Sequence, residues 1–167
     1  GARASQIREN LFAYDQLTVQ DMQAIQLDHR ALLLTRWHQL LQSTLAAADH
    51  SDLPWVAAMK SALSDWNGEA ATDSVAYRIV RSYRHEVMKT VLNGFAAQVR
   101  QIDAAFQLPR LSQAEWIVWQ LIENKPRHLL PSTFKNWEEL LFLSAQQTAG
   151  QMQQDGGITE RNWGMQN

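Results

Sequence analysis

The sequence predicts an all-α fold, an irregular bundle of about six helices. Seven Gly and four Pro among 167 residues leave few positions for turns, which favours long elements over many short strands. Alanine, leucine and glutamine are frequent, and all three are good helix formers. Apolar residues recur at intervals of three and four, as on one face of an α-helix. The expected helices cover approximately residues 3–13, 19–48, 53–64, 73–104, 113–124 and 134–154.

A single long helix is expected over residues 19–48. Thr18 and Asp21 predict its start, because the hydroxyl can accept a hydrogen bond from a free amide and the carboxylate suits the positive helix end. The apolar stripe then continues at helical spacing through Met22, Ile25, Leu32, Leu33, Trp37, Leu40, Leu41 and Leu45.

The helix over residues 53–64 is bounded by capping and turn residues. Ser51 or Asp52 can cap its start, and Pro54 is tolerated in the first turn. Gly68 closes the segment Asp-Trp-Asn-Gly and is free to adopt a positive φ, so a turn is expected there.

The helix over residues 73–104 carries the longest apolar stripe. We expect Thr72 or Asp73 to cap it. Gly94 is its weak point, since glycine costs about 1 kcal/mol relative to alanine inside a helix. The stripe comprises Ala76, Ile79, Val80, Tyr83, Val87, Val91, Phe95, Val99 and Ile102.

The last two helices have clear starts. Ser112 and Glu115 have capping-box spacing. The final helix is expected to begin between Thr133 and Asn136 and to end at Gly156, because glycine tolerates the left-handed conformation of a helix end.

After the Gly156-Gly157 pair, the tail containing Trp163 and Gly164 is interpreted as the start of a strand. Natural domains seldom finish on an incomplete element with a large aromatic near the carboxylate. We therefore expect residues 1–167 to form a single helical subdomain cut from a larger protein, with no internal domain boundary.

Composition excludes several classes of function. The net charge of −2 with no dense basic cluster argues against nucleic-acid binding. The absence of cysteine excludes disulfides and thiol catalysis. No run of 18 apolar residues is present to span a membrane. The densest basic stretch is interpreted as a solvated helix face, formed by Arg78, Arg81, Arg84, His85 and Lys89.

No catalytic or metal motif is recognisable in the sequence. None of the five histidines lies three or four residues from another, so no helix presents a histidine pair and neither a metal nor a cofactor is expected. No phosphate-binding glycine loop and no glycine-flanked serine is present. Trp116 and Trp119 could form one wall of a ligand pocket, although core packing is the favoured interpretation.

Four stretches together resemble the penicillin acylase (penicillin amidase) family of N-terminal-nucleophile hydrolases, in the helical region of the large (β) subunit. They follow the family order across nearly the whole chain. They are Arg3-Ala-Ser-Gln-Ile7 with Leu11; Leu17-Thr-Val-Gln-Asp-Met22 with Ile25-Gln-Leu-Asp28; Leu63-Ser-Asp-Trp-Asn-Gly68 with Asp73-Ser74 and Ala76-Tyr77; and Leu129-Leu-Pro131 with the helix from Trp137 and Trp163-Gly164.

The resemblance implies a parent amidohydrolase that cleaves acyl amides such as β-lactam side chains or acyl-homoserine lactones. Its nucleophile would be an N-terminal serine outside this chain, activated by its own α-amine. Calcium is expected in the parent, outside this segment, and the parent is expected to be periplasmic or secreted. The expected partners are the small subunit and sheet core of the parent and a small amide substrate. The segment alone would be inactive and would self-associate through exposed apolar surface.

One site residue carries over from the resemblance. Arg3 matches an active-site-organising arginine of the family, and Arg8 is the alternative if the register slips. Gln6 departs from the pattern, which has a second arginine there. A different class of function is a free-standing helical module that binds a ligand or protein in a groove lined by Trp116, Trp119 or Trp137.

Overall fold

The computed structural model describes residues 2–47, 52–109, 111 and 113–166, and the all-α prediction is confirmed. Within these residues every regular element is helical. The α-helices are α1 (Ala2–Phe12), α2 (Val19–Leu27), α3 (Leu32–Ala47), α4 (Pro54–Leu63), α5 (Val75–Arg100), α6 (Ala114–Asn124) and α7 (Trp137–Gln154). Two short 3-10 helices, η1 (Arg127–Leu129) and η2 (Gly164–Gln166), complete the chain.

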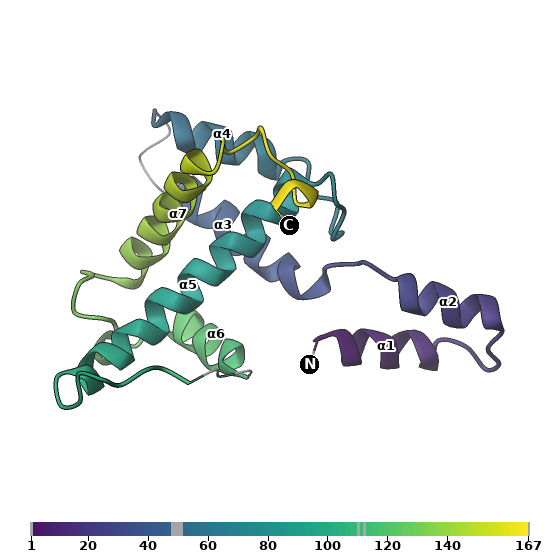
Figure 1. The fold of residues 1–167 in the computed structure, drawn as a ribbon, viewed down its shortest axis with the longest axis horizontal. Helices are drawn as coiled ribbons and strands as arrows, with labels where there is room; N and C mark the ends of the chain where they lie inside the picture. The colour runs from purple at the N-terminus through teal and green to yellow at the C-terminus, as the bar shows by residue number, and fades with distance from the viewer. Residues whose placement is uncertain (1, 48–51, 110, 112, 167) are drawn as a thin grey trace.

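Helix α5 is the centre of the fold (Figure 1). It packs against α3, α4, α6 and α7, and α3 and α4 also contact α7. Helices α1 and α2 lie side by side as a hairpin that extends away from this body. The core is built from the predicted stripes and includes Trp37, Leu41, Ile79, Tyr83 and Leu140, all fully buried.

The single helix predicted over residues 19–48 is wrong, because the chain leaves the helix between α2 and α3. Asp28 ends α2 in an extended conformation, with φ −60° and ψ 111°. The segment then pairs with the loop before α5: Ala31 N donates to Gly68 O at 2.6 Å and Ala70 N donates to His29 O at 2.8 Å. These long-range hydrogen bonds replace helical ones, so apolar spacing alone could not reveal the break.

The predicted cap of α2 is confirmed, and α7 begins next to the expected range, directly after Asn136. Thr18 accepts from the amide of Asp21, and Asp21 in turn accepts from the Thr18 amide. Asn136 caps α7 by accepting from Glu139 N at 2.7 Å. Ser112, the expected cap of α6, lies outside the described residues.

The predicted caps of α4 and α5 are wrong. Ser74 caps α5, with its hydroxyl accepting from Tyr77 N at 3.0 Å. Leu53 precedes α4 without a side-chain cap, since a leucine side chain has no acceptor, and Pro54 follows in the first turn, where its missing amide hydrogen is tolerated. The caps expected instead were Thr72 or Asp73 for α5 and Ser51 or Asp52 for α4, of which Ser51 lies outside the described residues.

The apolar stripe of α5 is buried only as far as Phe95. Val99 is 41% exposed, and Ile102, which lies beyond the end of the helix at Arg100, is 92% exposed. The apolar pattern therefore continues for about two turns beyond Phe95, which is itself half-buried.

The tail after α7 forms no strand within the described residues, which corrects the strand-like interpretation. Gly156 and Gly157 have φ values of 106° and 115°, as expected for a helix end. Trp163 N then donates to Ser74 O at 3.2 Å, and Gly164 N donates to Thr72 O at 2.6 Å. The tail thus satisfies its backbone against the loop before α5 and ends in η2.

Gly94 is a close-packing position rather than a weak point. A Cβ atom at this position would lie 2.5 Å from Pro131 Cγ and 2.8 Å from Pro131 Cβ. The proline ring cannot rotate away as a long flexible side chain would, so only glycine allows this approach.

We expect Gly94→Ala to lower the free energy of unfolding by about 1–3 kcal/mol, because steric overlap outweighs the gain in helix propensity. Gly150→Ala, in α7 and with open space around the added methyl group, is the matched control. It should stabilise the protein by about 0.5–1 kcal/mol. Urea unfolding of both variants measures the two changes, and a stabilising Gly94→Ala would contradict the proposed close packing.

Candidate functional site

Arg3 links the two helices of the hairpin. Its guanidinium donates to Ile25 O at 2.9 Å, to Gln26 O at 2.9 Å and to Asp28 O at 2.7 Å. These carbonyls lie at the end of α2, where helical amide partners run out and the dipole favours positive charge. Arg3 therefore acts as a C-terminal cap for α2 supplied by α1.

Asp28 organises the segment after α2. Its carboxylate accepts from the Arg30 guanidinium at 2.6 Å and from Asn10 at 2.8 Å. The hydrogen bond from Arg30 is the main reason that the pKa of Asp28 lies far below its usual range, against an opposing effect of burial. Gln6, buried on α1, donates to Arg30 O at 3.3 Å, so the residue that departs from the family pattern holds this segment in place.

The solvated arginine face predicted on α5 is wrong in part. Arg78 is only 1% exposed and donates to Gly157 O at 3.1 Å and Arg161 O at 3.0 Å. Burial, reinforced by the charge of Arg161, lowers the pKa of Arg78. Arg81 is exposed but lies over the ring of Trp163, 4.4 Å from its centroid.

Glu115 on α6 joins α3 and α5. It accepts from Arg84 at 2.5 Å, from Arg36 at 3.1 Å and from the indole of Trp37 at 2.7 Å. Burial raises the pKa of Glu115, but the hydrogen bonds from Arg84, Trp37 and Arg36 outweigh it, and the pKa lies below its usual range.

Several of the arginines described above line a cavity of about 370 Å³ between the hairpin and the body, which we call the arginine cavity. Arg3 and Arg30 reach it from the hairpin side, and Arg81 and Arg84 reach it from α5. Arg8 is not part of its lining. The remaining lining residues are Ala2, Gln6, Asp28, His29, Ala31, Leu32, Leu33, Leu34, Ala70 and Tyr77. Sequence reasoning identified Arg3 but missed the other three arginines, although the i, i+3 spacing of Arg81 and Arg84 places both on one helix face.

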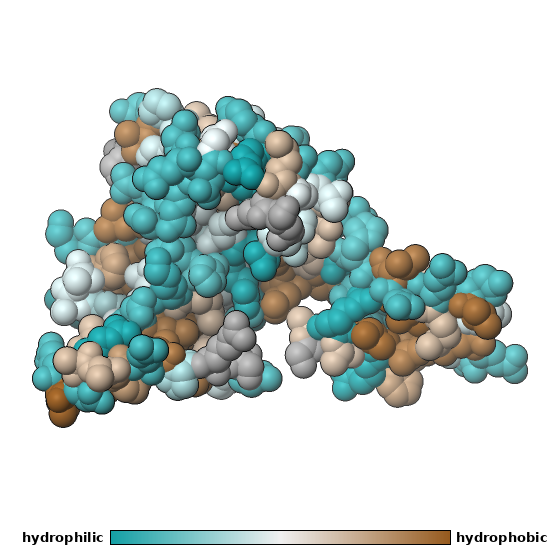
Figure 2. Space-filling view, viewed as in Figure 1, coloured by the Kyte–Doolittle hydropathy of each residue, from teal (hydrophilic) through white to brown (hydrophobic). Residues whose placement is uncertain are grey.

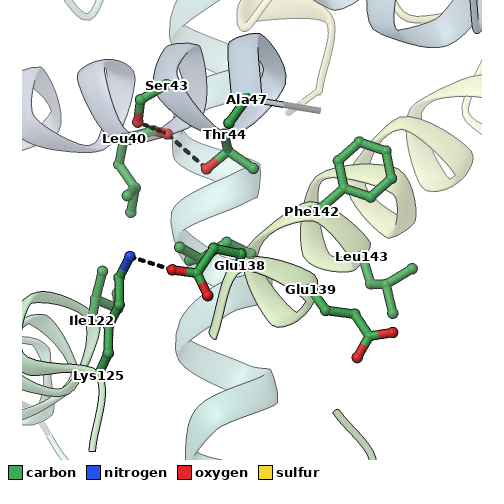
Figure 3. A pocket seen from close by; sticks show the side chains of 11 residues that line it. Leu40, Ser43, Thr44, Ala47, Ile122, Lys125, Glu138, Glu139, Phe142 and Leu143 are labelled. Carbon is green, nitrogen blue, oxygen red and sulfur yellow. Dashed lines mark hydrogen bonds and ion pairs between the residues drawn. The ribbon is translucent and has the colours of Figure 1, made fainter. Parts of the chain in front are cut away.

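A second cavity, of about 660 Å³, lies between α3, α6 and α7 (Figure 3). Its walls are mostly apolar, and Lys125 and Glu138 form an ion pair of 2.5 Å on its lining. The hydroxyls of Ser43 and Thr44 both donate to Leu40 O at 2.8 Å, so neither is paired with a general base. This arrangement provides an apolar hollow without a nucleophile.

The three tryptophans proposed for a binding groove do not share one. Trp116 is 67% exposed, so the core packing favoured for it is wrong, while Trp119 packs edge-on against Trp37 with centroids 5.2 Å apart. Trp137 is in the core and donates to Pro126 O at 3.2 Å. None of the three lines either of the two cavities described above.

In the part of the chain that the structure describes, no three His, Asp or Glu side chains are grouped as metal ligands. None of the described helices combines the length and hydrophobicity needed to cross a bilayer.

The fold is a helical body with an extended hairpin, and the arginine cavity brings charged side chains of both together. The family model described as penicillin amidase matches residues 1–167. The chain belongs to the penicillin amidase family, as the resemblance predicted. No match was found among curated proteins or among solved structures.

We expect Glu115→Gln to lower the free energy of unfolding by about 2 kcal/mol near neutral pH, because two arginines lose their shared carboxylate in a half-buried setting. Glu123→Gln is the control, since Glu123 also accepts from an indole, at 2.6 Å from Trp119 Nε1, but pairs with no arginine. Its effect should stay below about 0.5 kcal/mol.

The stability difference between wild type and Glu115→Gln should depend on pH. The pKa of Glu115 is lower in the folded state than the value of about 4.3 expected when unfolded, so its contribution is complete above that pH and lost as pH falls through the folded pKa. Thermal unfolding from pH 7 to pH 2 should therefore show the difference between wild type and Glu115→Gln shrinking in acid. A difference independent of pH would contradict the charge-based account.

Proposed function

We propose that this chain is the helical subdomain of a penicillin acylase-type amidohydrolase that cleaves a linear acyl amide. The match of the family model to residues 1–167 is the observation that carries this proposal. The nucleophile would be an N-terminal serine outside the chain, as in the mechanism where an α-amine takes the proton from the hydroxyl. The chain would support the substrate cleft, with calcium bound elsewhere in the parent.

Arg3 is the residue of this chain that we assign to the active site of the parent. Its three hydrogen bonds to carbonyls at the end of α2 fix the guanidinium, and it lines the arginine cavity. A guanidinium held in this way is preorganised to orient a substrate or a neighbouring catalytic group. Arg8 has no comparable placement on the cavity lining, which supports Arg3 as the match.

The exposed apolar side chains of the hairpin support its packing against the rest of the parent. Phe12 is 83% exposed, Val19 80%, Leu27 66% and Met22 49%. Figure 2 shows apolar surface gathered over the extended hairpin. Apolar area of this kind marks a surface that another part of a protein covers.

In the parent enzyme, Arg3→Gln should reduce kcat/KM for a chromogenic acyl amide about a hundredfold, because an orienting group is lost. Arg8→Gln, on the same helix, should leave activity unchanged. Melting temperatures of both variants separate a catalytic effect from loss of the α2 cap. A larger loss of kcat/KM in Arg8→Gln than in Arg3→Gln would assign the active-site role to Arg8. Hydrolysis by the 167-residue chain alone would contradict the proposal that the nucleophile lies outside this chain.

The isolated chain should self-associate through the hairpin. Phe12→Ser should shift sedimentation velocity profiles towards the monomer without lowering the melting temperature, because Phe12 makes little contact with the body. Ile102→Ser is the matched control, since Ile102 is equally apolar and 92% exposed but lies after α5. Equal effects of both substitutions, or a wild type that sediments as a monomer, would argue against the hairpin as the contact surface.

A further inference from the structure

Arg78 on α5 is a cation inside the core that carbonyls alone satisfy. It is 1% exposed, and none of the ion pairs between described residues includes it. Its Nε is buried and has no hydrogen-bond partner among the described residues. A buried charge without a partner of opposite charge is costly, and an apolar side chain of similar size would stabilise the core better. The contribution of Arg78 therefore lies in what it holds in place.

Arg78 holds the turn that begins the C-terminal tail. The same atom, Nη1, donates to Gly157 O at 3.1 Å and to Arg161 O at 3.0 Å. Ile158, between these two carbonyls, is 5% exposed and packs in the core. The side chain of Ile158 thus anchors the start of the tail, whereas the direction in which the chain leaves this turn is set by the guanidinium.

Beyond the turn, the tail lies against the loop before α5 at close range. Trp163 N donates to Ser74 O at 3.2 Å, and Gly164 N donates to Thr72 O at 2.6 Å. A Cβ atom on Gly164 would lie 2.9 Å from Thr72 O, a backbone atom that cannot rotate away. The tail therefore has one closely defined position on this loop.

That position places the ring of Trp163 against two residues that line the arginine cavity. The ring packs edge-on against Tyr77, with centroids 5.3 Å apart, and the Arg81 guanidinium lies 4.4 Å from its centroid. Neither Trp163 nor Arg78 lines the cavity itself. No ion pair between described residues includes Arg81, so its contact with Trp163 is the interaction that orients it.

We propose that Arg78 is a positioning residue of the arginine cavity that acts through the C-terminal tail. It fixes the turn at residues 157–161, the turn places Trp163, and Trp163 orients Tyr77 and Arg81 on the cavity wall. The consequence for catalysis rests on the function proposed above, whereas the orientation of the wall is a property of this chain.

The positioning role is tested on the 15N-labelled 167-residue chain with Arg78→Met, which keeps the length of the side chain and removes its donors. Hydrogen exchange at the amides of Trp163 and Gly164 should become about tenfold faster, because the turn that presents them is released. The Arg81 Nε–Hε signal should move, because the ring current of Trp163 no longer acts on it. The melting temperature should change little, since an uncompensated buried charge is removed.

Two further variants separate positioning from general loss of structure. Gly164→Ala leaves Arg78 in place, displaces the end of the tail and should move the same Arg81 signal, so it decides the question even where Arg78→Met does not fold. Arg78→Lys keeps the charge and a donor, and it should restore most of the wild-type exchange rates.

Arg100→Met is the matched control. Arg100 also lies on α5 and donates to a later carbonyl, from Nε to Phe106 O at 3.1 Å, but it is outside the cavity lining. It should leave the Trp163 amide and the Arg81 signal unchanged. Unchanged exchange in Arg78→Met would show that Ile158 alone anchors the tail and would overturn the proposal. A released tail with an unmoved Arg81 signal would overturn the link to the cavity.

The inference and the proposed function fail separately. In the parent, Arg78→Met and Gly164→Ala should each lower kcat/KM for a chromogenic acyl amide about tenfold, because a misplaced wall disturbs the orientation of the substrate. Arg100→Met should not. Undiminished kcat/KM despite a moved Arg81 signal would contradict the catalytic consequence. A parent without amidase activity, while the chain still shows the Arg81 shift, contradicts the hydrolase proposal and leaves the positioning role intact.

Discussion

The placement of the arginine cavity depends on the four residues at 28–31 leaving the helix. Continuing α2 into α3 would satisfy local hydrogen bonding and the apolar stripe. In the observed path, long-range partners form hydrogen bonds with the same backbone groups. Arg3 donates to Asp28 O, Gln6 donates to Arg30 O, and residues 29 and 31 pair with the loop at 68–70. Replacing one helical hydrogen bond by one long-range hydrogen bond changes the free energy little. Several long-range partners acting together therefore decide whether the helix breaks. The break then turns the hairpin so that Arg3 and the arginines of α5 face one space.

Helix α5 shows how this fold accommodates cations without a matching number of carboxylates. Arg78 uses the carbonyls of Gly157 and Arg161, Arg81 uses the face of Trp163, and Arg84 uses the carboxylate of Glu115. Carbonyl oxygens and an aromatic face stabilise a guanidinium while leaving its full positive charge in place. The C-terminal tail therefore has two roles. Its carbonyls accept hydrogen bonds from the buried Arg78, and it holds Trp163 against Arg81, which reaches the cavity.

Features encoded within a few residues were predictable from the sequence. The helical class, the capping box at Thr18, the cap at Asn136 and the glycine stop at Gly156 each depend on neighbours in the chain. The break after Asp28, the burial of Arg78 and the contact of Gly94 with Pro131 depend on residues between 24 and 83 positions away. For the site, the family motif indicated Arg3, whereas Arg30, Arg81 and Arg84 became relevant only once the fold placed them around one cavity.

The contacts in the two cavities support the proposed function, in which the nucleophile lies outside this chain. A nucleophile needs a base within hydrogen-bond reach, and the hydroxyls of the larger cavity instead donate to a backbone carbonyl within their own helix. The arginine cavity brings four guanidiniums and the apolar side chains of Leu32, Leu33 and Leu34 to one space. Under the function proposed above, the reacting serine lies outside this chain, so the contribution of the helical domain is to place Arg3 and to support the cleft rather than to supply the nucleophile.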